Sequence, residues 1–273
     1  MLDELRSARR GQPALPPLAP DTYARGHAAF EALSDQRALI GRHLSARLAG
    51  RGAGPVSLLS VGCGDGSLDA PQAAALADVS PARPVRYVGV DPYEPSTAAF
   101  AAAMAALGRD NLTAEVHTAT FAEAPVGGAF DVVTFVHSMY YVPDVAATLR
   151  AAHDLLLPRG ELLVLSAPRG ALNLLVDVLA PPVDEHRQWF SDDIAAGVAA
   201  AGATPEETVT LEGRLSLDGA GDEVLDFAVQ ARLTPELRPL VRAYLEAVSV
   251  ACPTSGVLHV PHPVDVHCLR RAA

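Results

Sequence analysis

Three glycines stand at alternate positions directly after an apolar run, where residues 61–66 read Val-Gly-Cys-Gly-Asp-Gly. Glycine allows a tight turn and leaves a backbone surface without side chains, against which a ligand can lie. A dinucleotide-binding turn needs its third glycine one residue later, where this chain has Ser67. The spacing therefore predicts a nucleotide-type site that does not hold a diphosphate.

An acidic residue ends the next apolar run, since Asp91 follows residues 85–90. A carboxylate at the tip of the second strand of a nucleotide-binding fold can accept hydrogen bonds from two ribose hydroxyls. S-Adenosylmethionine has a ribose and no phosphate, so it fits both the glycines and Asp91. We expect it to be the cofactor.

A third polar group follows residues 130–136, where His137 is succeeded by Tyr140 and Tyr141. Histidine exchanges a proton near neutral pH, and tyrosine offers a flat apolar wall with one polar tip. We predict that His137 and Tyr141 are catalytic. A structural, hydrogen-bonded role for His137 is the alternative, and at least one of the two tyrosines is expected to belong to the core. Trp189 either lines the substrate pocket or packs on the helix that begins after Ser191.

Other residues give no reason to predict a metal site. His259, His262 and His267 alternate with Asp265 along a probable strand beside two prolines. Three cysteines without repeated spacing indicate neither a disulfide framework nor a zinc site of the paired-cysteine kind. Their number and spacing favour a reducing compartment.

Short apolar runs alternate with helix-length segments from residue 56 onward. The runs cover residues 56–61, 85–90, 112–116, 130–136 and 161–165, and helices are expected at 68–77, 97–107, 145–156 and 192–201. Runs buried on both faces and separated by helices predict a largely parallel sheet with right-handed crossovers. We expect a flexible lead-in over residues 1–20 and one domain from residue 21. Within it, residues 21–54 form substrate-covering helices, 55–211 the cofactor-binding core, 212–256 a helical insertion and 257–273 the final strand.

Charge and hydropathy exclude several classes of partner. The 273-residue chain has 21 basic residues, all arginine, against 32 acidic ones, a formal charge of -11. A nucleic acid or an anionic membrane surface needs a basic face on its protein partner, so neither is expected. The N-terminus lacks the apolar stretch of a signal peptide, and no apolar run is long enough to cross a bilayer. We therefore expect a cytoplasmic protein with a small-molecule substrate, as a monomer or weak dimer.

Residues 61–66, Val90-Asp91 and Phe130-Asp131-Val132-Val133 together resemble the class I S-adenosylmethionine-dependent methyltransferases over roughly residues 55–170. The resemblance implies a Rossmann-like α/β fold with a mostly parallel seven-stranded sheet, N-terminal helices and a helical insertion before the last strand. The predicted cofactor-binding residues are Gly62, Cys63, Gly64, Asp91, Pro92, Thr120, Phe121, Val136 and His137.

Further segments are similar to the histamine N-methyltransferase group, above all residues 139–144 (Met-Tyr-Tyr-Val-Pro-Asp). This resemblance implies a small-molecule N-methyltransferase with an aromatic substrate pocket. The substrate-binding residues predicted on this basis are Tyr23, Phe30, Gln36, Tyr140, Tyr141 and Trp189. The chain differs from the group at Gln36, where an acid is usual, and at His137, where an amide is usual. Histamine itself is therefore in question.

We predict an enzyme of natural-product biosynthesis that moves a methyl group to the nitrogen of a small aromatic or heteroaromatic amine by in-line displacement. Carbon or oxygen methylation of an indole or another natural-product intermediate is the alternative. A cofactor-binding protein without catalytic activity is the third hypothesis.

Overall fold

The computed structural model describes residues 1–10, 12–52, 54–182, 186–201 and 205–272, and the chain divides into two compact units. Unit 1 comprises Met1–Leu39, Ala167–Phe190 and Thr210–Val264. Unit 2 comprises Ile40–Ser166, Ser191–Val209 and Asp265–Ala273. The single domain expected from residue 21 stays a prediction.

A seven-stranded sheet of order β3-β2-β1-β4-β5-β10-β6 is the centre of unit 2. Its strands are β1 (Val56–Val61), β2 (Val85–Asp91), β3 (Leu112–Thr118), β4 (Phe130–Val136), β5 (Leu156–Ser166), β6 (Glu207–Leu211) and β10 (Val264–Arg270). The first five pair in parallel, whereas β10 runs antiparallel to β5. The predicted Rossmann-like fold with a mostly parallel seven-stranded sheet is therefore confirmed.

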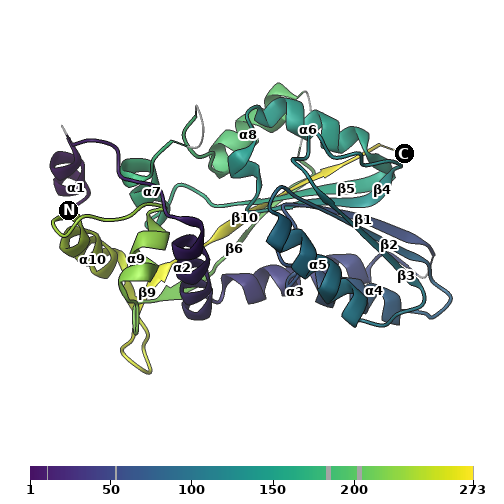
Figure 1. Cartoon of the computed structure of the whole chain (residues 1–273), viewed down its shortest axis with the longest axis horizontal. Coiled ribbons are helices and arrows are strands. Elements are labelled where there is room, and N and C mark those ends of the chain that lie inside the picture. Colours follow the sequence, from purple (N-terminus) through teal and green to yellow (C-terminus); the bar gives the residue numbers. More distant parts are fainter. Residues whose placement is uncertain (11, 53, 183–185, 202–204, 273) are drawn as a thin grey trace. The chain divides into compact units, whose positions relative to one another are not determined.

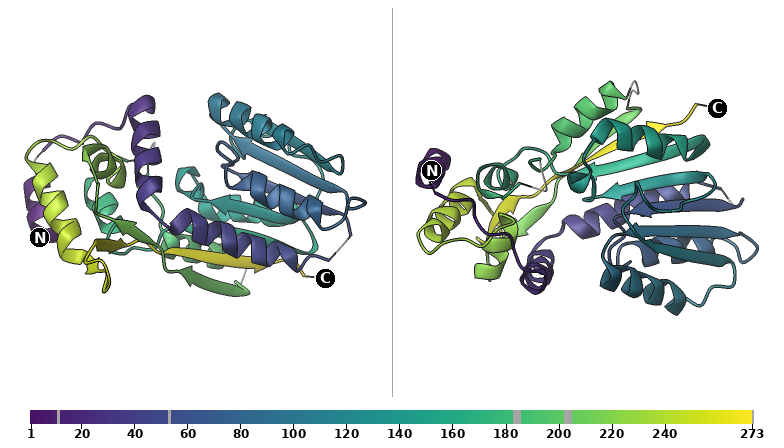
Figure 2. Two further views of the ribbon diagram at one scale, coloured as in Figure 1. Left: turned by 90° about the horizontal axis from the view of Figure 1, so that it is seen from below. Right: turned by 45° about the horizontal axis from the view of Figure 1, so that its top comes forward.

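Helices cover both faces of this sheet (Figures 1 and 2). On one face lie α4 (Asp69–Asp78), α5 (Glu94–Ala106) and the part of α3 (Gln36–Ala49) that belongs to unit 2. On the other lie α6 (Val145–Asp154) and α8 (Ser191–Ala200). Strands β1, β2 and β4 are buried almost throughout, as their valine-rich and leucine-rich runs require. The edge strand β3 is largely exposed and is correspondingly more polar.

Unit 1 has its own apolar core, built mainly by helices. These are α1 (Leu2–Arg9), α2 (Pro20–Leu33), α7 (Asn173–Leu179), α9 (Asp222–Ala228) and α10 (Leu237–Val248). A second sheet in this unit has the order β7-β9-β8, formed by Arg214–Ser216, Leu258–Pro261 and Val250–Ala251. Both of its pairings are antiparallel.

Two segments differ from the sequence expectation. Residues 1–20 were expected to be a flexible lead-in, yet they include α1, and both Leu5 and Leu15 are buried. Apolar side chains at i and i+3 give α1 one face that packs on α10 and α7. Residues 212–256 were expected to be purely helical, but they contribute β7 and β8 to the small sheet. Strands of three and two residues are too short to show an alternating pattern.

No helix in the described part of the chain combines the length and the apolar character needed to cross a bilayer.

Candidate active site

The glycine turn closes β1 onto the end of β2. The N–H groups of Gly62 and Cys63 both donate to the carbonyl of Val90, at 2.7 and 3.2 Å. Gly62 has a φ of 73°, and a Cβ atom added there would overlap the Cβ atom of Ser138. Gly64 has a φ of 55°, but a Cβ there would meet no atom within 4 Å. Packing therefore requires glycine at position 62, while position 64 presents bare backbone to a ligand.

Asp91 lies beside this turn. One carboxylate oxygen accepts the N–H of Gly64 at 3.1 Å, and the other accepts the N–H of Tyr93 at 2.9 Å. A carboxylate offers about four lone-pair positions, so both oxygens can still accept ribose hydroxyls. The bare backbone at Gly64 and the oriented carboxylate thus fit S-adenosylmethionine. Pro92 follows Asp91 on the exposed side of the turn.

Cys63 is not a nucleophile in this turn. Burial raises the pKa of its thiol far above the ordinary range, and the carboxylates of Asp69 and Asp91 raise it further. The thiol is therefore protonated at neutral pH, and only a thiolate reacts readily. The role of Cys63 is structural. Its backbone forms part of the turn, and its sulfur fills the space next to Gly89 that a Cβ atom at that position would need.

The other predicted cofactor-binding residues follow β3 and β4. Thr120 is exposed in the loop after β3 and donates from its hydroxyl to Glu123 at 2.7 Å. Phe121 packs edge-on against Phe135, with ring centroids 5.4 Å apart. Val136 is the last residue of β4. The carboxyl ends of parallel strands share one edge of a sheet, so unit 2 brings all of the predicted cofactor-binding residues to that edge.

His137 has an unusual backbone conformation at the end of β4. Its φ is 51°, a left-handed value that few non-glycine residues adopt. Its N–H donates to the carbonyl of Leu165 at 3.0 Å, and its Nδ1 lies 2.6 Å from the hydroxyl of Tyr140. Strained residues of this kind cluster at functional sites, where the surrounding structure maintains them.

The two tyrosines after His137 have different environments. Both belong to the short 3-10 helix η1 (Met139–Tyr141), and their ring centroids are 6.3 Å apart. Tyr140 is buried, whereas 54% of Tyr141 is exposed. Tyr140 therefore packs in the interior and holds His137, and Tyr141 is accessible to a substrate. The catalytic roles of His137 and Tyr141 stay predictions.

The remaining predicted substrate residues lie in unit 1. Tyr23 and Phe30 both contact the ring of Phe227, with centroid separations of 5.2 and 5.1 Å. Gln36 is buried and donates both amide hydrogens, to the carbonyls of His262 at 2.9 Å and Pro263 at 3.2 Å. These bonds give Gln36 a structural role that the sequence did not suggest.

Trp189 is half-buried in unit 1. Its ring stacks on His186, with centroids 4.8 Å apart and an interplanar angle of 14°. The adjacent Phe190 is buried and lies under the guanidinium of Arg169 at 4.5 Å. The substrate-binding role of Trp189 stays a prediction.

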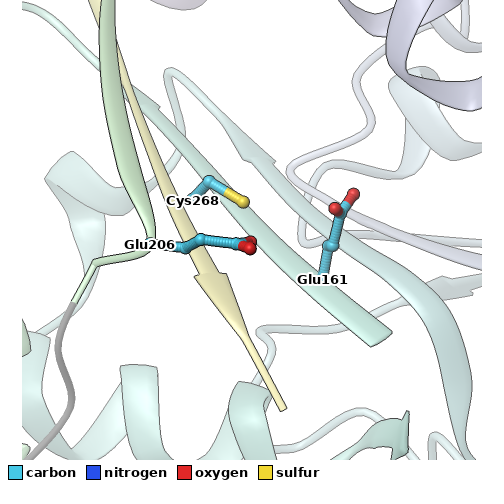
Figure 3. Close-up of side chains that lie close together, drawn as sticks. All are labelled: Glu161, Glu206 and Cys268. Atoms are coloured by element: carbon cyan, nitrogen blue, oxygen red, sulfur yellow. The ribbon is translucent and has the colours of Figure 1, made fainter. Parts of the chain in front are cut away.

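Three potential metal ligands gather at one place in unit 2: Glu161, Glu206 and Cys268, whose ligand atoms lie within 4.8 Å of one another (Figure 3). Arg51 and Arg270 each approach the carboxylate of Glu161 at 2.5 Å. Arg270 also binds Glu206 at 2.7 Å. Although burial disfavours the charged form of Glu161, the neighbouring Arg51 and the other arginines lower its pKa.

A further arginine completes this network. Arg47 Nη2 lies 2.8 Å from the Cys268 sulfur, and Arg47 also pairs with Glu161 and Glu207. Burial raises the pKa of Cys268 to about 11, so its thiol is a poor metal ligand at neutral pH. The guanidinium groups supply the positive charge that a cation would bring. We therefore interpret the group as an ion-pair network and assign no metal to it.

The C-terminal histidines have separate partners. His262 Nδ1 lies 2.8 Å from the hydroxyl of Ser34 in unit 1. His267 Nε2 lies 2.8 Å from the hydroxyl of Ser191 in unit 2. Each ring is thus held by a serine, and neither contact is that of a metal ligand.

A family model described as a methyltransferase domain matches residues 30–208, which is more than half of the chain. The chain belongs to this methyltransferase-domain family. It is accordingly an S-adenosylmethionine-dependent methyltransferase, as the resemblance implied, and the cofactor expected from the glycine turn and Asp91 is confirmed. No curated protein matches its sequence.

Solved structures with a similar fold come from several organisms. The YcgJ protein of Bacillus subtilis is 14% identical with a TM-score of 0.57, over 84% of this chain and 98% of that one. A magnesium protoporphyrin IX methyltransferase of Synechocystis, solved with bound S-adenosylhomocysteine, is 13% identical with a TM-score of 0.52. The match covers 99% of this chain and 94% of that one. A cyclopropane synthase of Mycobacterium tuberculosis is 15% identical with a TM-score of 0.51, over 84% and 83%. At these identities the likeness establishes the fold alone.

The sequence did not reveal the pairing of Ser34 with His262 or the central position of Phe227. Ser34 and His262 are 228 residues apart, so no local pattern connects them. Phe227 is one of the buried apolar residues of α9. The helical spacing of apolar residues does not distinguish a core residue from one that lines a site.

Proposed function

We propose that this methyltransferase acts on the nitrogen of a small aromatic or heteroaromatic amine. The main support is the pairing of His137 with Tyr140 at the carboxyl end of β4, the same sheet edge as Asp91 and the glycine turn. An imidazole at this edge is suited to exchange a proton with an acceptor group. The predicted resemblance to the histamine N-methyltransferase group is consistent with this proposal.

The chain's own residues would have two tasks. The first is to hold the cofactor, with Asp91 accepting from the ribose hydroxyls and the backbone of Gly62 to Gly64 lying against it. The cofactor supplies a methyl group that its sulfonium already activates. The second task is to hold the acceptor in line and to keep its nitrogen unprotonated. The contact between Nδ1 of His137 and the hydroxyl of Tyr140 would orient the ring for this exchange.

Methylation of carbon or oxygen, for example on an indole or a phenol, is the second candidate function. It is favoured by Gln36, whose buried amide is committed to two backbone carbonyls and brings no negative charge toward an ammonium group. In that case His137 would remove the proton of the hydroxyl or the activated carbon.

A methyl-transfer screen tests both candidates. The purified protein is incubated with tritiated S-adenosylmethionine and matched sets of aromatic amines, indoles and phenols, and mass spectrometry locates the methyl group on each product. We expect transfer to nitrogen, and transfer that is confined to carbon or oxygen would favour the second candidate. Calorimetric binding of the cofactor with no turnover on any acceptor would contradict both and support a non-catalytic protein.

We also propose that the enzyme is cytoplasmic, serves natural-product biosynthesis and is a monomer or weak dimer. Its net charge of -11 makes a nucleic acid an unsuitable partner. Sedimentation velocity over a range of protein concentrations tests the oligomeric state, and a tight higher oligomer would contradict it.

A further inference from the structure

A buried carboxylate lies directly behind the glycine turn of unit 2. Helix α4 continues from this turn, because the N–H of Ala70 donates to the carbonyl of Gly66 at 2.8 Å, and Asp69 is the first residue of the helix. The Asp69 side chain is only 5% exposed. An acid that merely begins a helix can do so in solvent, and burying a charge is costly. The burial of Asp69 therefore calls for a further explanation.

Two features favour the ionised form of Asp69. The first is Tyr87, whose hydroxyl donates to Oδ1 of the carboxylate at 2.8 Å. Burial raises the pKa of Tyr87 well above its ordinary range, and the charge of Asp69 raises it further, so the phenol keeps its proton and is the donor. The second is the N-terminal end of α4, where the helix dipole favours a negative charge. Asp69 is therefore a buried anion.

This anion lies on the same face of β2 as the ribose-binding residue. Tyr87, Gly89 and Asp91 alternate along the strand, so they share the face on which α4 and α5 pack (Figure 1). The sulfur of Cys63 lies over Gly89 on this face. After burial itself, the largest influence on the pKa of the Cys63 thiol is the charge of Asp69, ahead of that of Asp91. The field of Asp69 therefore reaches the turn that holds the cofactor.

The cofactor loses a positive charge during the reaction. When the methyl group moves to the lone pair of the acceptor, the electron pair of the broken carbon–sulfur bond stays on sulfur. The sulfonium of S-adenosylmethionine thereby becomes the neutral thioether of S-adenosylhomocysteine. A fixed negative charge favours the cation and has little effect on the neutral product. One unit charge at roughly 10 Å, in a medium with an effective dielectric constant of about 20, changes a binding constant about tenfold.

We propose that Asp69 is a specificity-determining residue, whose buried charge makes the site favour the cationic cofactor over the neutral product. Tyr87 is the positioning residue that holds this carboxylate in the interior. The inference concerns the cofactor alone, so it goes beyond the proposed function and holds whichever acceptor atom is methylated. It adds to the site a second acid that acts through its field and not through contact with the ribose.

Titration calorimetry of the full-length protein without an acceptor measures the relevant affinities, because no methyl transfer takes place. The ligands are S-adenosylmethionine, S-adenosylhomocysteine and sinefungin, which has an ammonium group in place of the methylated sulfonium. The wild type should bind both cations more tightly than the neutral product. Asp69→Asn keeps an oxygen for Tyr87 but has no charge. It should weaken both cations about tenfold and change the affinity for S-adenosylhomocysteine by less than about twofold.

Two further variants separate charge from structure. Tyr87→Phe removes the hydrogen bond but leaves the carboxylate, so it should retain a preference for the cations at pH 8. Asp78→Asn is the matched control, because it makes the same change in the last residue of the same helix, where the side chain is 56% exposed and pairs with Arg109. It should leave all three affinities unchanged. Circular dichroism shows which variants are folded, and Asp69→Ser removes the same charge if Asp69→Asn does not fold.

Three results would overturn the inference. The first is a wild type that binds the neutral product as tightly as the two cations. The second is an equal loss of affinity for all three ligands in a folded Asp69 variant, which is the result of a purely structural role. The third is an Asp78→Asn variant that weakens the cations as much as Asp69→Asn does, since the preference would then come from the net charge of the protein.

Discussion

Acidification should destabilise the protein through His262. Burial lowers the pKa of this ring to about 4 in the folded chain, against 6.5 for an ordinary histidine. Well above pH 6.5 the ring is neutral in both the folded and the unfolded chain, and this contribution to stability is fully present. As the pH falls from 6.5 toward 4, the unfolded chain binds a proton that the folded chain does not, so stability decreases. The two pKa values predict a loss of about 2 kcal/mol between pH 8 and pH 5 and of about 3 kcal/mol by pH 4.

Urea unfolding of the wild type and of His262→Asn measures this contribution. Trp189 is the only tryptophan of the chain and belongs to the same unit as His262, so its fluorescence reports unfolding where the ring is buried. Other groups titrate in both proteins, and the informative quantity is therefore the difference between their free energies of unfolding. The destabilisation caused by His262→Asn should be smaller at pH 5 than at pH 8, by about 2 kcal/mol.

His259→Asn is the matched control, because it removes a histidine that is only half-buried on the neighbouring strand β9. It should leave the pH dependence of the wild type in place. If the wild type and His262→Asn lose stability in parallel from pH 8 to pH 5, then His262 is not buried as a neutral ring.

Five other substitutions test the site and its support. Asp91→Ala should weaken binding of S-adenosylmethionine by about 1.5 to 3 kcal/mol in calorimetry, and an unchanged affinity would refute the ribose assignment. Gly62→Ala should cost more than about 2 kcal/mol in urea unfolding, because its methyl group overlaps a side chain. Gly64→Ala should cost only about 1 kcal/mol, because its backbone conformation disfavours alanine but its methyl group meets no atom. Equal losses in the two variants would contradict the packing account. Glu161→Gln removes the buried carboxylate that pairs with two half-buried arginines and one exposed arginine, and it should cost about 1.5 to 3 kcal/mol in urea unfolding. A neutral effect would show that the network is dispensable. His137→Ala should lower turnover more than cofactor affinity, and the reverse pattern would make this residue part of the cofactor site.

Much of unit 2 could be predicted from the sequence, because a strand that is buried on both faces is a continuous run of apolar residues. The strands at Val56–Val61 and Phe130–Val136 begin and end where their apolar runs do. The turn at Gly62 and the carboxylate of Asp91 were predictable for a related reason, because each stands at the end of such an apolar run. A parallel sheet then brings the strand ends to one edge without further information.

Unit 1 could not be predicted to the same extent, because its order depends on contacts between distant segments. Residues 1–20 look unpatterned, yet Leu5 is buried by helices that come more than 150 residues later in the chain. The buried position of His262 likewise depends on Ser34 and Phe30, and nothing in its sequence neighbourhood distinguishes it from the half-buried His259. Local periodicity carries no information about such pairings.

The arginine network of unit 2 helps to fix the register in which β10 pairs with β5. Strand β10 pairs with β5 in a register that sets Arg270 beside Glu161 and places Cys268 next to Arg47. A slip of one residue would turn both side chains to the opposite face of the sheet and leave Glu161 buried without Arg270. The native register is therefore distinguished from its nearest competitors by charge as well as by apolar contact. The ion pair between Arg270 and Glu161 therefore favours the native pairing of β10 with β5 over a shifted one.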